Sequence, residues 1–404
     1  MQDKKNHRFY AACPWGLEAV LEEELAACGA KRSRKTPSGV MFEGTIETAY
    51  LACLRSRIAS RVMMEVSFHD YWDSRDIYEQ ARRTPWELYF TPDQTFRISI
   101  SAHRAPLKSL EFTTLRIKDA VCELAGTRPD ISRESPDVQI AAFLDEKYCT
   151  LYIDLSGESL FKRGWRTDKG EAPLKENMAA GLLKLSGWTP DMPLLDPFCG
   201  SGTIAIEAAS IACGLVPGIS RSFGFEKLLN FDRELWTELR EDAKSEVNLH
   251  REVSITASDI SSIVVRKAEA NALRAGLGGL LESGNLKFSV CDARNVLPPT
   301  ETPGIIVANP PYGEQSTPRS ATVGSMMRHV ADNLKHNFAG WTAWMLTSDR
   351  HLPGEMHLKE GRKTVLFNGP LECRFFKFDL VAGSNRRVKN RDAASDGTPS
   401  DAES

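Results

Sequence analysis

The stretch that decides the fold is residues 194–203, which read LLDPFCGSGT. An apolar strand end leads into Asp196 and then into a turn that carries Gly200 and Gly202 before a predicted helix. Glycine lets the backbone approach a ligand where a Cβ atom would clash, and a helix N-terminus presents free N–H groups. A glycine pair is also typical of an ordinary tight turn. The acid directly before it favours a ligand site at the carboxyl end of a strand.

Strands and helices alternate around this stretch as they do in a doubly wound α/β domain with a parallel sheet. We predict that this domain spans residues 174–382. Its helices are expected at 174–186, 203–213, 261–275 and 322–337, and its strands at 193–195, 254–257, 286–290, 304–307 and 343–347. Residues 214–253 interrupt the alternation and are interpreted as an insertion.

Two smaller α/β modules are predicted before this domain, at residues 1–48 and 49–156. The first has a strand at 8–13 and a helix at 16–27. The second has strands at 61–68, 94–101, 137–144 and 149–156, and helices at 76–86 and 115–125. Residues 157–173 are rich in glycine and charge, which predicts a linker or a functional loop. The tail, residues 383–404, is basic and then acidic and is expected to be disordered.

Acids follow the second and third predicted strands of the large domain. Asp259 comes directly after the alternating run SITAS, and a carboxylate there can accept hydrogen bonds from the hydroxyls of a ribose. Glu226 has the spacing of a compact dinucleotide unit, but its segment lacks a strand pattern, so Asp259 is preferred. Capping of the next helix is the alternative for Asp259. Asp292 ends the third strand, where it either accepts a bond from an exocyclic adenine amine or serves as a turn residue.

The fourth predicted strand ends in Asn309, Pro310, Pro311 and Tyr312. Two prolines force an extended path, which directs the Asn309 side chain and the Pro310 carbonyl at one small volume. Both groups accept hydrogen bonds and suit an exocyclic amine that attacks a methyl group. Tyr312 would stack on a planar target. A proline-rich turn without chemistry is the alternative, and the site on the preceding strands argues against it.

Composition limits the class of protein. With 404 residues, of which 42% are hydrophobic and 26% charged, the chain is long enough for two or three folded domains. Its nine cysteines lack the spacing of a metal site or a disulfide framework, so we expect no metal and a cytoplasmic location. No signal peptide or run of about 20 apolar residues is found, so no membrane association is expected.

Several stretches resemble a known family. DPFCGSGTIAIEAA (196–209), Asp259, Asp292 and NPPYGE (309–314) resemble the class I methyltransferases that act on exocyclic nitrogens. APLKEN (172–177), PGISRSFGFEKL (217–228) and LFNGPLECRFFKF (366–378) look more narrowly like the bacterial guanine-N2 methyltransferases of large-subunit (23S) ribosomal RNA. The resemblance covers almost the whole chain except its tail. Ala308 departs from it, because relatives often have a more polar residue before the Asn-Pro-Pro-Tyr motif.

The resemblance implies an architecture and a chemistry. The Rossmann-like class I methyltransferase domain would follow a ferredoxin-like segment and a THUMP domain, which is an RNA-binding module. The implied cofactor is S-adenosylmethionine, and the implied partner is 23S ribosomal RNA or a precursor large-subunit particle. Asn309, Pro310, Pro311 and Tyr312 would take the guanine amine. The implied cofactor-binding residues are Asn177, Asp196, Pro197, Phe198, Cys199, Gly200, Ser201, Gly202, Thr203, Asp259, Ile260, Asp292, Ala293 and Asn309.

Contact with RNA needs local basic groups, because the formal net charge of the chain is −3. The preferred cluster lies in the loop before the methyltransferase domain: Lys162, Arg163, Trp165, Arg166 and Lys169. Its cations would neutralise phosphates and Trp165 would stack on an unpaired base. A second cluster holds Arg104, Lys108, Arg116 and Lys118. A solvated surface is the alternative for both clusters.

Three other functions compete with RNA methylation. DNA adenine-N6 methylation uses a similar acceptor motif, but the N-terminal half shows no helix-turn-helix. Methylation of a protein glutamine amide suits the same motif, and the long N-terminal half disfavours it. A non-catalytic RNA-binding scaffold would have no need of the glycines, the three acids and the Asn-Pro-Pro-Tyr motif, all of which are present.

Overall fold

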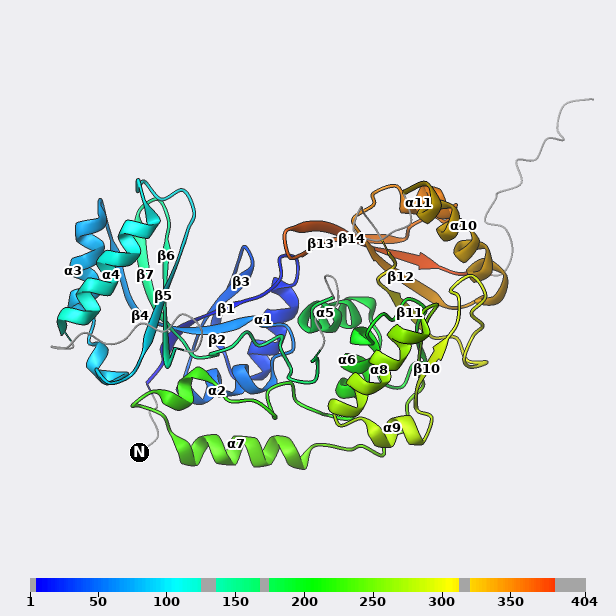
Figure 1. The fold of residues 1–404 in the computed structure, drawn as a ribbon, viewed down its shortest axis with the longest axis horizontal. Coiled ribbons are helices and arrows are strands. Elements are labelled where there is room, and N and C mark those ends of the chain that lie inside the picture. The colour runs from blue at the N-terminus through cyan, green and yellow to red at the C-terminus, as the bar shows by residue number, and fades with distance from the viewer. Residues whose placement is uncertain (1–4, 125–135, 168–173, 312–319, 382–404) are drawn as a thin grey trace, which may run out of the picture.

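The computed structural model describes residues 5–124, 136–167, 174–311 and 320–381. Figure 1 shows an elongated molecule with an N-terminal and a C-terminal lobe, each built on its own sheet. The elements of the N-terminal lobe are β1 (His7–Ala12), α1 (Glu18–Ala27), β2 (Lys31–Thr36), β3 (Gly39–Gly44), α2 (Ile46–Arg55), β4 (Arg61–Asp70), α3 (Ser74–Arg83), η1 (Trp86–Leu88), β5 (Phe96–Ala102), α4 (Leu110–Leu124), β6 (Val138–Leu144) and β7 (Tyr148–Asp154).

One continuous sheet runs through the N-terminal lobe, with the strand order β2-β3-β1-β4-β7-β6-β5. The long strand β4 joins its two halves, because its first residues pair with β1 and most of its length pairs with β7. The predicted border between residues 48 and 49 falls inside α2, so it does not separate two modules. Thr45 caps α2 by accepting a hydrogen bond from the Thr48 backbone, which places the start of this helix before that border.

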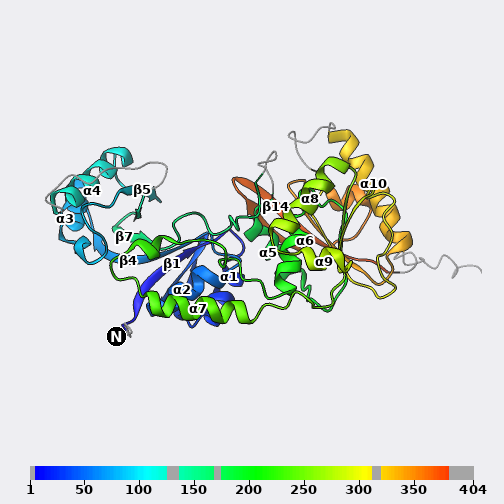
Figure 2. The same ribbon diagram turned by 60° about the horizontal axis from the view of Figure 1, so that its bottom comes forward.

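The N-terminal strands are explained by alternation of apolar and polar residues. Phe9 and Ala11 on β1 are buried, as are Val40 and Phe42 on β3, whereas their neighbours along each strand are more exposed. A strand turns successive side chains to opposite faces, so this pattern buries one face and leaves the other toward solvent. Figures 1 and 2 show that α1 and α2 lie against one face of the β1–β3 region.

The C-terminal lobe carries the predicted doubly wound domain. Its elements are α5 (Glu176–Ser186), β8 (Leu194–Asp196), α6 (Thr203–Ala212), η2 (Gly224–Lys227), α7 (Arg233–Ser245), β9 (Ile255–Asp259), α8 (Ser262–Arg274), α9 (Gly278–Glu282), β10 (Leu286–Val290), β11 (Ile305–Ala308), α10 (Ser320–Asn337), β12 (Thr342–Thr347), α11 (Leu352–Met356), β13 (Arg362–Asn368) and β14 (Leu371–Asp379). The strand order is β10-β9-β8-β11-β12-β14-β13. Five strands are parallel, and β14 runs antiparallel to β12.

The predicted insertion at residues 214–253 binds the N-terminal lobe. Phe225 of η2 stacks on Tyr50 of α2 with 4.2 Å between ring centroids, and the Asp232 N–H donates to the Tyr50 hydroxyl at 3.2 Å. The Gly218 N–H donates to the Leu54 carbonyl at 2.9 Å. In Figure 2, α7 lies alongside α2 at the bottom of the N-terminal lobe. The insertion therefore ties the two lobes together.

The described part of the segment at residues 157–173 is a buried junction, which corrects the prediction of a linker. Arg163 is 7% exposed, donates to Glu207 of α6 at 3.2 Å and to the Arg57 carbonyl at 2.6 Å. Arg57 also approaches Glu207, at 3.5 Å. Arg221 of the insertion donates to carbonyl oxygens of this segment, including that of Glu158 at 2.6 Å. These bonds fix the segment between the lobes.

A second contact joins the lobes at the carboxyl end of the C-terminal sheet. Trp15 meets Phe367 of β13 edge-on at 5.0 Å between centroids. The β13–β14 turn lies at this edge, because Arg374 of β14 pairs with Thr347, the last residue of β12. A Cβ atom on Gly16 would lie 2.5 Å from the Val365 carbonyl oxygen, so the approach requires glycine there.

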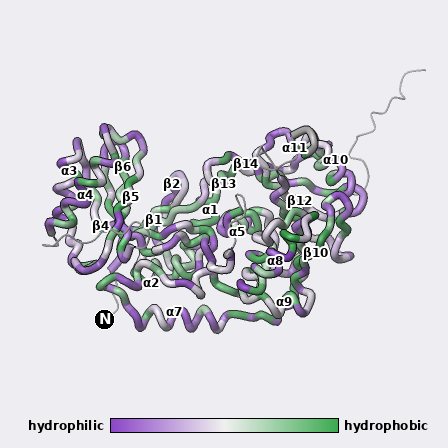
Figure 3. The backbone as a smooth tube through the Cα atoms, in the orientation of Figure 1, coloured by the Kyte–Doolittle hydropathy of each residue, from purple (hydrophilic) through white to green (hydrophobic). Residues whose placement is uncertain are grey.

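Hydropathy follows this architecture. Figure 3 shows hydrophilic segments predominating along α3 and α7 at the periphery of the molecule. No helix within the described ranges combines the length and apolarity needed to cross a membrane. Among the same residues, no group of three or more His, Cys, Asp or Glu side chains is placed to hold a metal ion.

Candidate cofactor and catalytic site

Three of the predicted site residues lie at one edge of the C-terminal sheet. Asp196 ends β8, Asp259 ends β9, and Asn309 follows β11. These strands are parallel neighbours, with β8 between the other two. Their carboxyl ends therefore meet, which is the position of ligand sites in open α/β sheets.

The glycine turn after β8 is held against β9. The Cys199 N–H donates to the Ser258 carbonyl at 2.9 Å, and the Gly200 N–H donates to Asp259 Oδ2 at 3.2 Å. Gly202 has a φ of 87°, and a Cβ atom there would lie within 3.0 to 3.2 Å of three side chains. Gly200 has a φ of 52°, and its missing Cβ points into open space. Gly202 thus serves close packing, whereas Gly200 leaves room beside the turn.

Asp196 is almost fully buried, and its Oδ1 accepts one hydrogen bond, from the Phe198 N–H at 3.1 Å. Burial, with a smaller contribution from the nearby Asp259, raises the pKa of this carboxyl to about 8. A buried carboxylate is stabilised by a positive partner. Asp196 is therefore suited to a ligand that brings a positive charge.

Asp259 organises the site around it. Its Oδ1 accepts from the Ser261 N–H at 3.0 Å, while its Oδ2 holds the Gly200 N–H. Ser261 is the N-cap of α8 but makes no side-chain cap bond, so Asp259 forms a turn before the helix rather than the predicted alternative of a helix cap. Glu226, which we rejected for this role, lies in η2 and accepts from the Phe223 N–H at 2.8 Å. It belongs to the insertion that packs on the N-terminal lobe.

Asp292 lies two residues beyond the end of β10 and is bound by Arg294. The Arg294 Nε donates to both of its carboxylate oxygens at 3.0 Å, which holds the pKa of Asp292 below its ordinary value. Asn333 of α10 fixes this loop by donating to the Val296 carbonyl at 2.8 Å. An adenine amine would share Asp292 with Arg294, so the adenine role stays a prediction.

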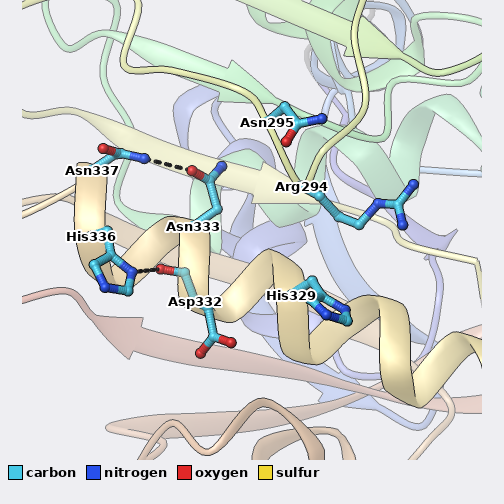
Figure 4. A pocket seen from close by; sticks show the side chains of 7 residues that line it. All are labelled: Arg294, Asn295, His329, Asp332, Asn333, His336 and Asn337. Carbon is cyan, nitrogen blue, oxygen red and sulfur yellow. Dashed lines mark hydrogen bonds between the residues drawn. The ribbon is translucent and has the colours of Figure 1, made fainter.

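Figure 4 shows a shallow pocket of about 480 Å³ on the side of this loop that faces α10. Its lining is polar and holds neither the glycine turn nor Asp196: Arg294, Asn295, His329, Asp332, Asn333, His336 and Asn337. The close-up shows the lining residues of α10 bonded among themselves, for example Asn337 to Asn333 at 2.7 Å. This pocket is separate from the candidate site.

Asn309 carries the clearest sign of an absent partner. Its Oδ1 is buried and has no hydrogen-bond partner among the described residues. A buried acceptor without a partner costs about 1–3 kcal/mol, so a polar atom of this kind at a sheet edge calls for a donor. Pro310 is buried and Pro311 half-buried beside it. Tyr312, the predicted stacking residue, lies outside the described residues.

The loop expected to bind RNA instead supports the glycine turn. Arg166 donates to Ser201 Oγ at 2.6 Å, to Thr203 Oγ1 at 2.7 Å and to Glu176 of α5 at 3.0 Å. Asn271 of α8 donates to the Ser201 carbonyl at 2.9 Å. Arg166 is thus a positioning residue for the turn that our interpretation of the sequence missed.

The predicted RNA contacts in this loop are therefore wrong for three residues. Arg163 is paired with Glu207, Trp165 is only 6% exposed, and Arg166 is committed to the turn. Arg163 and Trp165 are buried in these contacts, and the partly buried Arg166 already bonds the turn. Lys162 is exposed and pairs with Glu158, and Lys169 lies outside the described residues. Spacing in the sequence did not reveal that the loop is buried.

Asn177 contacts the N-terminal lobe through its amide nitrogen, while its Oδ1 is buried without a partner among the described residues, so its role in the cofactor pocket stays a prediction. Its amide nitrogen donates to the Ile58 carbonyl at 3.1 Å and to Ser60 Oγ at 3.0 Å, both in the N-terminal lobe. The side chain thus belongs to the contact between the lobes. Its neighbour Glu176 reaches the turn instead, through Arg166.

We predict that Arg166→Lys weakens binding of S-adenosylmethionine about tenfold. A lysine retains the charge beside Glu176 but cannot bond both Ser201 and Thr203, and a bond to a charged group contributes roughly 1.5–3 kcal/mol. Isothermal titration calorimetry measures this affinity. Lys162→Met, an exposed cation in the same loop, is the control and should bind the cofactor like the wild type. Unchanged cofactor affinity with weaker RNA binding would restore the original interpretation.

Family models match three consecutive parts of the chain. The RlmL ferredoxin-like domain matches residues 8–63, the THUMP domain residues 72–154, and the RMKL-like methyltransferase domain residues 163–377. These matches confirm the predicted architecture, a Rossmann-like class I domain preceded by a ferredoxin-like segment and a THUMP domain. They place the end of the first unit near residue 63 rather than 48.

Solved structures share the whole fold. The structure of SMU.472 in complex with SAH is 28% identical with a TM-score of 0.83, over 96% of this chain and 100% of that chain. A predicted N6-adenine-specific DNA methylase from Listeria monocytogenes is 29% identical with a TM-score of 0.83, over 93% and 97%. TrmN from Thermus thermophilus, at 20% identity and a TM-score of 0.66, shows the fold alone.

Curated relatives are called ribosomal RNA large subunit methyltransferase K/L. The protein of Psychromonas ingrahamii is 40% identical over 89% of this chain, and that of Methylococcus capsulatus is 38% identical over 92%. These matches cover 48% and 51% of the relatives, so the chain spans about half of their length. Because the RMKL-like methyltransferase model matches residues 163–377, which is more than half of the chain, the chain belongs to the RMKL-like methyltransferase family.

Proposed function

We propose that this chain transfers a methyl group from S-adenosylmethionine to the exocyclic N2 amine of a guanine in 23S ribosomal RNA. The observation that carries the proposal is the buried, unpartnered Oδ1 of Asn309 at the carboxyl edge of the sheet. It lies beyond β11, the neighbour of the strand that carries Asp196 and the glycine turn. An acceptor that needs a donor there suits an incoming amine.

The residues of the site fit S-adenosylmethionine. Gly200 leaves open space at the turn. Asp196 is a buried acid with no cationic partner among the described residues. Asp259 ends the adjacent strand. Asp196 and the turn would hold the methionine part, Asp259 the ribose and Asp292 the adenine. When bound, the cofactor supplies a methyl group on a positively charged sulfur.

The chain contributes position rather than a strong base. Asn309 Oδ1 and the Pro310 carbonyl accept the two hydrogens of the amine, which orients its lone pair for attack in line with the methyl group. The two prolines restrict the backbone, so both acceptors are held in place before the substrate arrives. The amine proton is lost after transfer. Tyr312, the next residue in the sequence after the prolines, would stack on the guanine.

Guanine in ribosomal RNA is favoured by two comparisons. The curated relatives are called large-subunit ribosomal RNA methyltransferases, and the THUMP match at residues 72–154 agrees with an RNA substrate. We therefore propose 23S ribosomal RNA or a precursor large-subunit particle as the partner, and the cytoplasm as the location. The Listeria relative is named as a DNA adenine methylase, so methylation of adenine in DNA is the alternative that the experiment must exclude.

The test is methylation with labelled S-adenosylmethionine of total RNA from a strain that lacks this protein. Nucleoside analysis should find the label in N2-methylguanosine, and mapping should place it in 23S ribosomal RNA. Genomic DNA from the same strain is the parallel substrate. Label in N6-methyladenine of that DNA would replace the proposal with the DNA alternative. If the protein did not bind S-adenosylmethionine at millimolar concentration, the alternative of a non-catalytic RNA-binding scaffold would be favoured.

We expect Asp259→Ala to lower the affinity for S-adenosylmethionine at least tenfold. The variant loses the proposed acceptor for the ribose hydroxyls and also the bond that holds the Gly200 N–H. Calorimetric titration measures the change. Asp191→Ala, which removes an exposed acid paired with Arg251 in the same lobe, is the control. Equal affinity of wild type and Asp259→Ala would assign the ribose to another residue.

A further inference from the structure

The uncovered face of the N-terminal sheet is a surface without a described role. On β1 the buried residues Phe9 and Ala11 alternate with Arg8 and Tyr10, which lie on the other face. Figures 1 and 2 show α3 and α4 on the outer side of the THUMP part and α1 and α2 below the ferredoxin-like part. The described helices of this lobe thus lie on one side of the sheet and leave the other uncovered.

Aromatic side chains cross this uncovered face. Phe68 of β4 and Phe143 of β6 both lie opposite Thr150 of the strand between them. The two residues are 41% and 40% exposed. Two strand spacings separate the residues, about 9–10 Å. The row therefore presents two apolar platforms on one plane.

Cations accompany these rings. The Arg8 guanidinium lies 5.5 Å from the centroid of Phe68, and the Lys147 ammonium lies 5.0 Å from that of Tyr148. Tyr148 itself stacks on Phe68 at 4.9 Å. Arg8 is paired with Glu65, and Asp70 lies opposite Tyr148 on the neighbouring strand. Aromatic platforms with cations beside them match the bases and phosphates of a single strand of RNA.

The basic strand β2 extends the surface at one edge of the sheet. Its sequence KRSRKT holds four cations and no acid, and residues 31–35 are all exposed. In the strand register, Lys31 lies opposite Glu43 of β3 and Arg34 lies opposite Met41. These side chains share the uncovered face with Arg8, which lies opposite Glu43 on the other side of β3. Arg32 pairs with Glu43 and Lys35 with Glu22, and a charged edge strand also prevents aggregation, so Lys31 and Arg34 are the cations that matter for the surface.

The chain segment after β1 links one end of this surface to the edge that holds the candidate catalytic site. Cys13, directly after β1, donates its N–H to the Ser38 carbonyl of the β2–β3 turn at 2.8 Å, and Trp15 contacts Phe367 at the carboxyl edge of the C-terminal sheet. In Figure 1 the uncovered face turns toward the C-terminal lobe. A strand of RNA lying on this face would lead toward Asn309.

We propose that the uncovered sheet face, with Phe68 and Phe143 as its platforms, binds a single-stranded segment of the RNA substrate. The proposal rests on RNA as the substrate and names the surface that holds it. It replaces the buried loop at Arg163 to Arg166 as the main RNA contact. Duplex RNA is not the expected occupant, because its bases are stacked internally and unavailable to the rings.

The test uses the full chain with Phe68→Ala and Phe143→Ala, singly and together. The probe is a fluorescein-labelled oligouridylate of about 12 nucleotides, with a duplex of equal length for comparison. Each single variant should bind the oligouridylate about tenfold more weakly, and the double variant about 100-fold. Phe112→Ala is the matched control, because Phe112 is 53% exposed but lies on α4, away from the uncovered face.

Affinity for S-adenosylmethionine and thermal unfolding are measured on every variant and should not change. The proposed RNA surface would be contradicted if the double variant bound the oligouridylate as tightly as the wild type. It would also be contradicted if the wild type bound the duplex more tightly, or if Phe112→Ala lost as much affinity as the single variants. None of these three results would contradict the proposed methylation of ribosomal RNA, because the methylation assay is independent of oligouridylate binding. A wild type that binds the oligouridylate but labels no RNA would instead contradict the proposed function.

Discussion

Asn309→Ala should reduce methyl transfer by at least about 100-fold while leaving the affinity for S-adenosylmethionine nearly unchanged. The side-chain oxygen of Asn309 is buried without a partner in the described structure, so its role begins when the amine arrives. Removing one group that acts on the reacting atoms of an enzyme costs roughly 10²–10³ in rate. Single-turnover methylation and calorimetric titration measure the two quantities separately.

Asn295→Ala is the matched control for this experiment. Asn295 is exposed on the loop after β10, in the polar pocket of Figure 4, and lies outside the proposed site. This variant should methylate at the wild-type rate. Turnover near the wild-type level in Asn309→Ala would show that the amine is held by other acceptors. A parallel loss of cofactor affinity would mean that Asn309 shapes the cofactor pocket instead.

Glu207→Ala should destabilise the protein by about 3–5 kcal/mol. Glu207 is nearly inaccessible to solvent and lies between Arg163 at 3.2 Å and Arg57 at 3.5 Å. Without the carboxylate, two guanidinium groups remain buried together, and removal of one partner from a buried ion pair has a cost of this size. Burial already lowers the pKa of Arg57, which reflects its poor solvation there.

Denaturant unfolding followed by circular dichroism measures this effect, and scanning calorimetry shows which lobe unfolds first. The control is Glu158→Ala, which removes an exposed carboxylate paired with Lys162 and should change stability by less than about 0.5 kcal/mol. Because Arg57 belongs to the N-terminal lobe and Glu207 to α6, we expect the contact between the lobes to loosen first. If Glu207→Ala had the same free energy of unfolding as the wild type, both arginines would have to gain contact with water through a local rearrangement of the structure.

The fold of the C-terminal lobe was predictable because its signals are local. Each predicted parallel strand is confirmed to within about two residues, for example 286–290 as β10 and 304–307 as β11. The hairpin of β13 and β14 was not predicted. Its two strands pair locally, from Asn368 with Leu371 to Arg362 with Lys377, so the hairpin was open to prediction. Its contact with Trp15 joins residues more than 300 positions apart, which no local pattern reveals.

The N-terminal lobe shows the limit of such patterns. Its strands and helices were largely anticipated, and the prediction divided them between two modules. The division agrees with the two family matches, at residues 8–63 and 72–154. The prediction did not show that the two modules share a sheet, because β4 pairs with β1 at one end and with β7 along the rest. Strand pairing over long sequence distances joins the halves into one sheet, and a sequence shows a strand but not its neighbours.

The site divides in the same way. The glycines, Asp196, Asp259 and Asn309 were found from sequence, because each lies at a strand end and parallel strands bring their carboxyl ends together. Asp292 was found too, but its bond to Arg294 was not. The supporting residues Arg166 and Asn271 lacked any sequence signal, since their function depends on reaching the turn from other elements.

The sequence by itself determined the doubly wound domain, the turn LLDPFCGSGT and the strand-end residues, because backbone preferences and the periodicity of strands are properties of neighbouring residues. Only the tertiary structure decided which charges face solvent. Arg163 and Arg166 resemble RNA-binding cations along the chain, yet folding buries them beside Glu207 and the turn. Arg8 and Phe68 carry no motif, yet sheet pairing brings them together on an open face. Burial is set by contacts between distant residues, which local sequence does not encode.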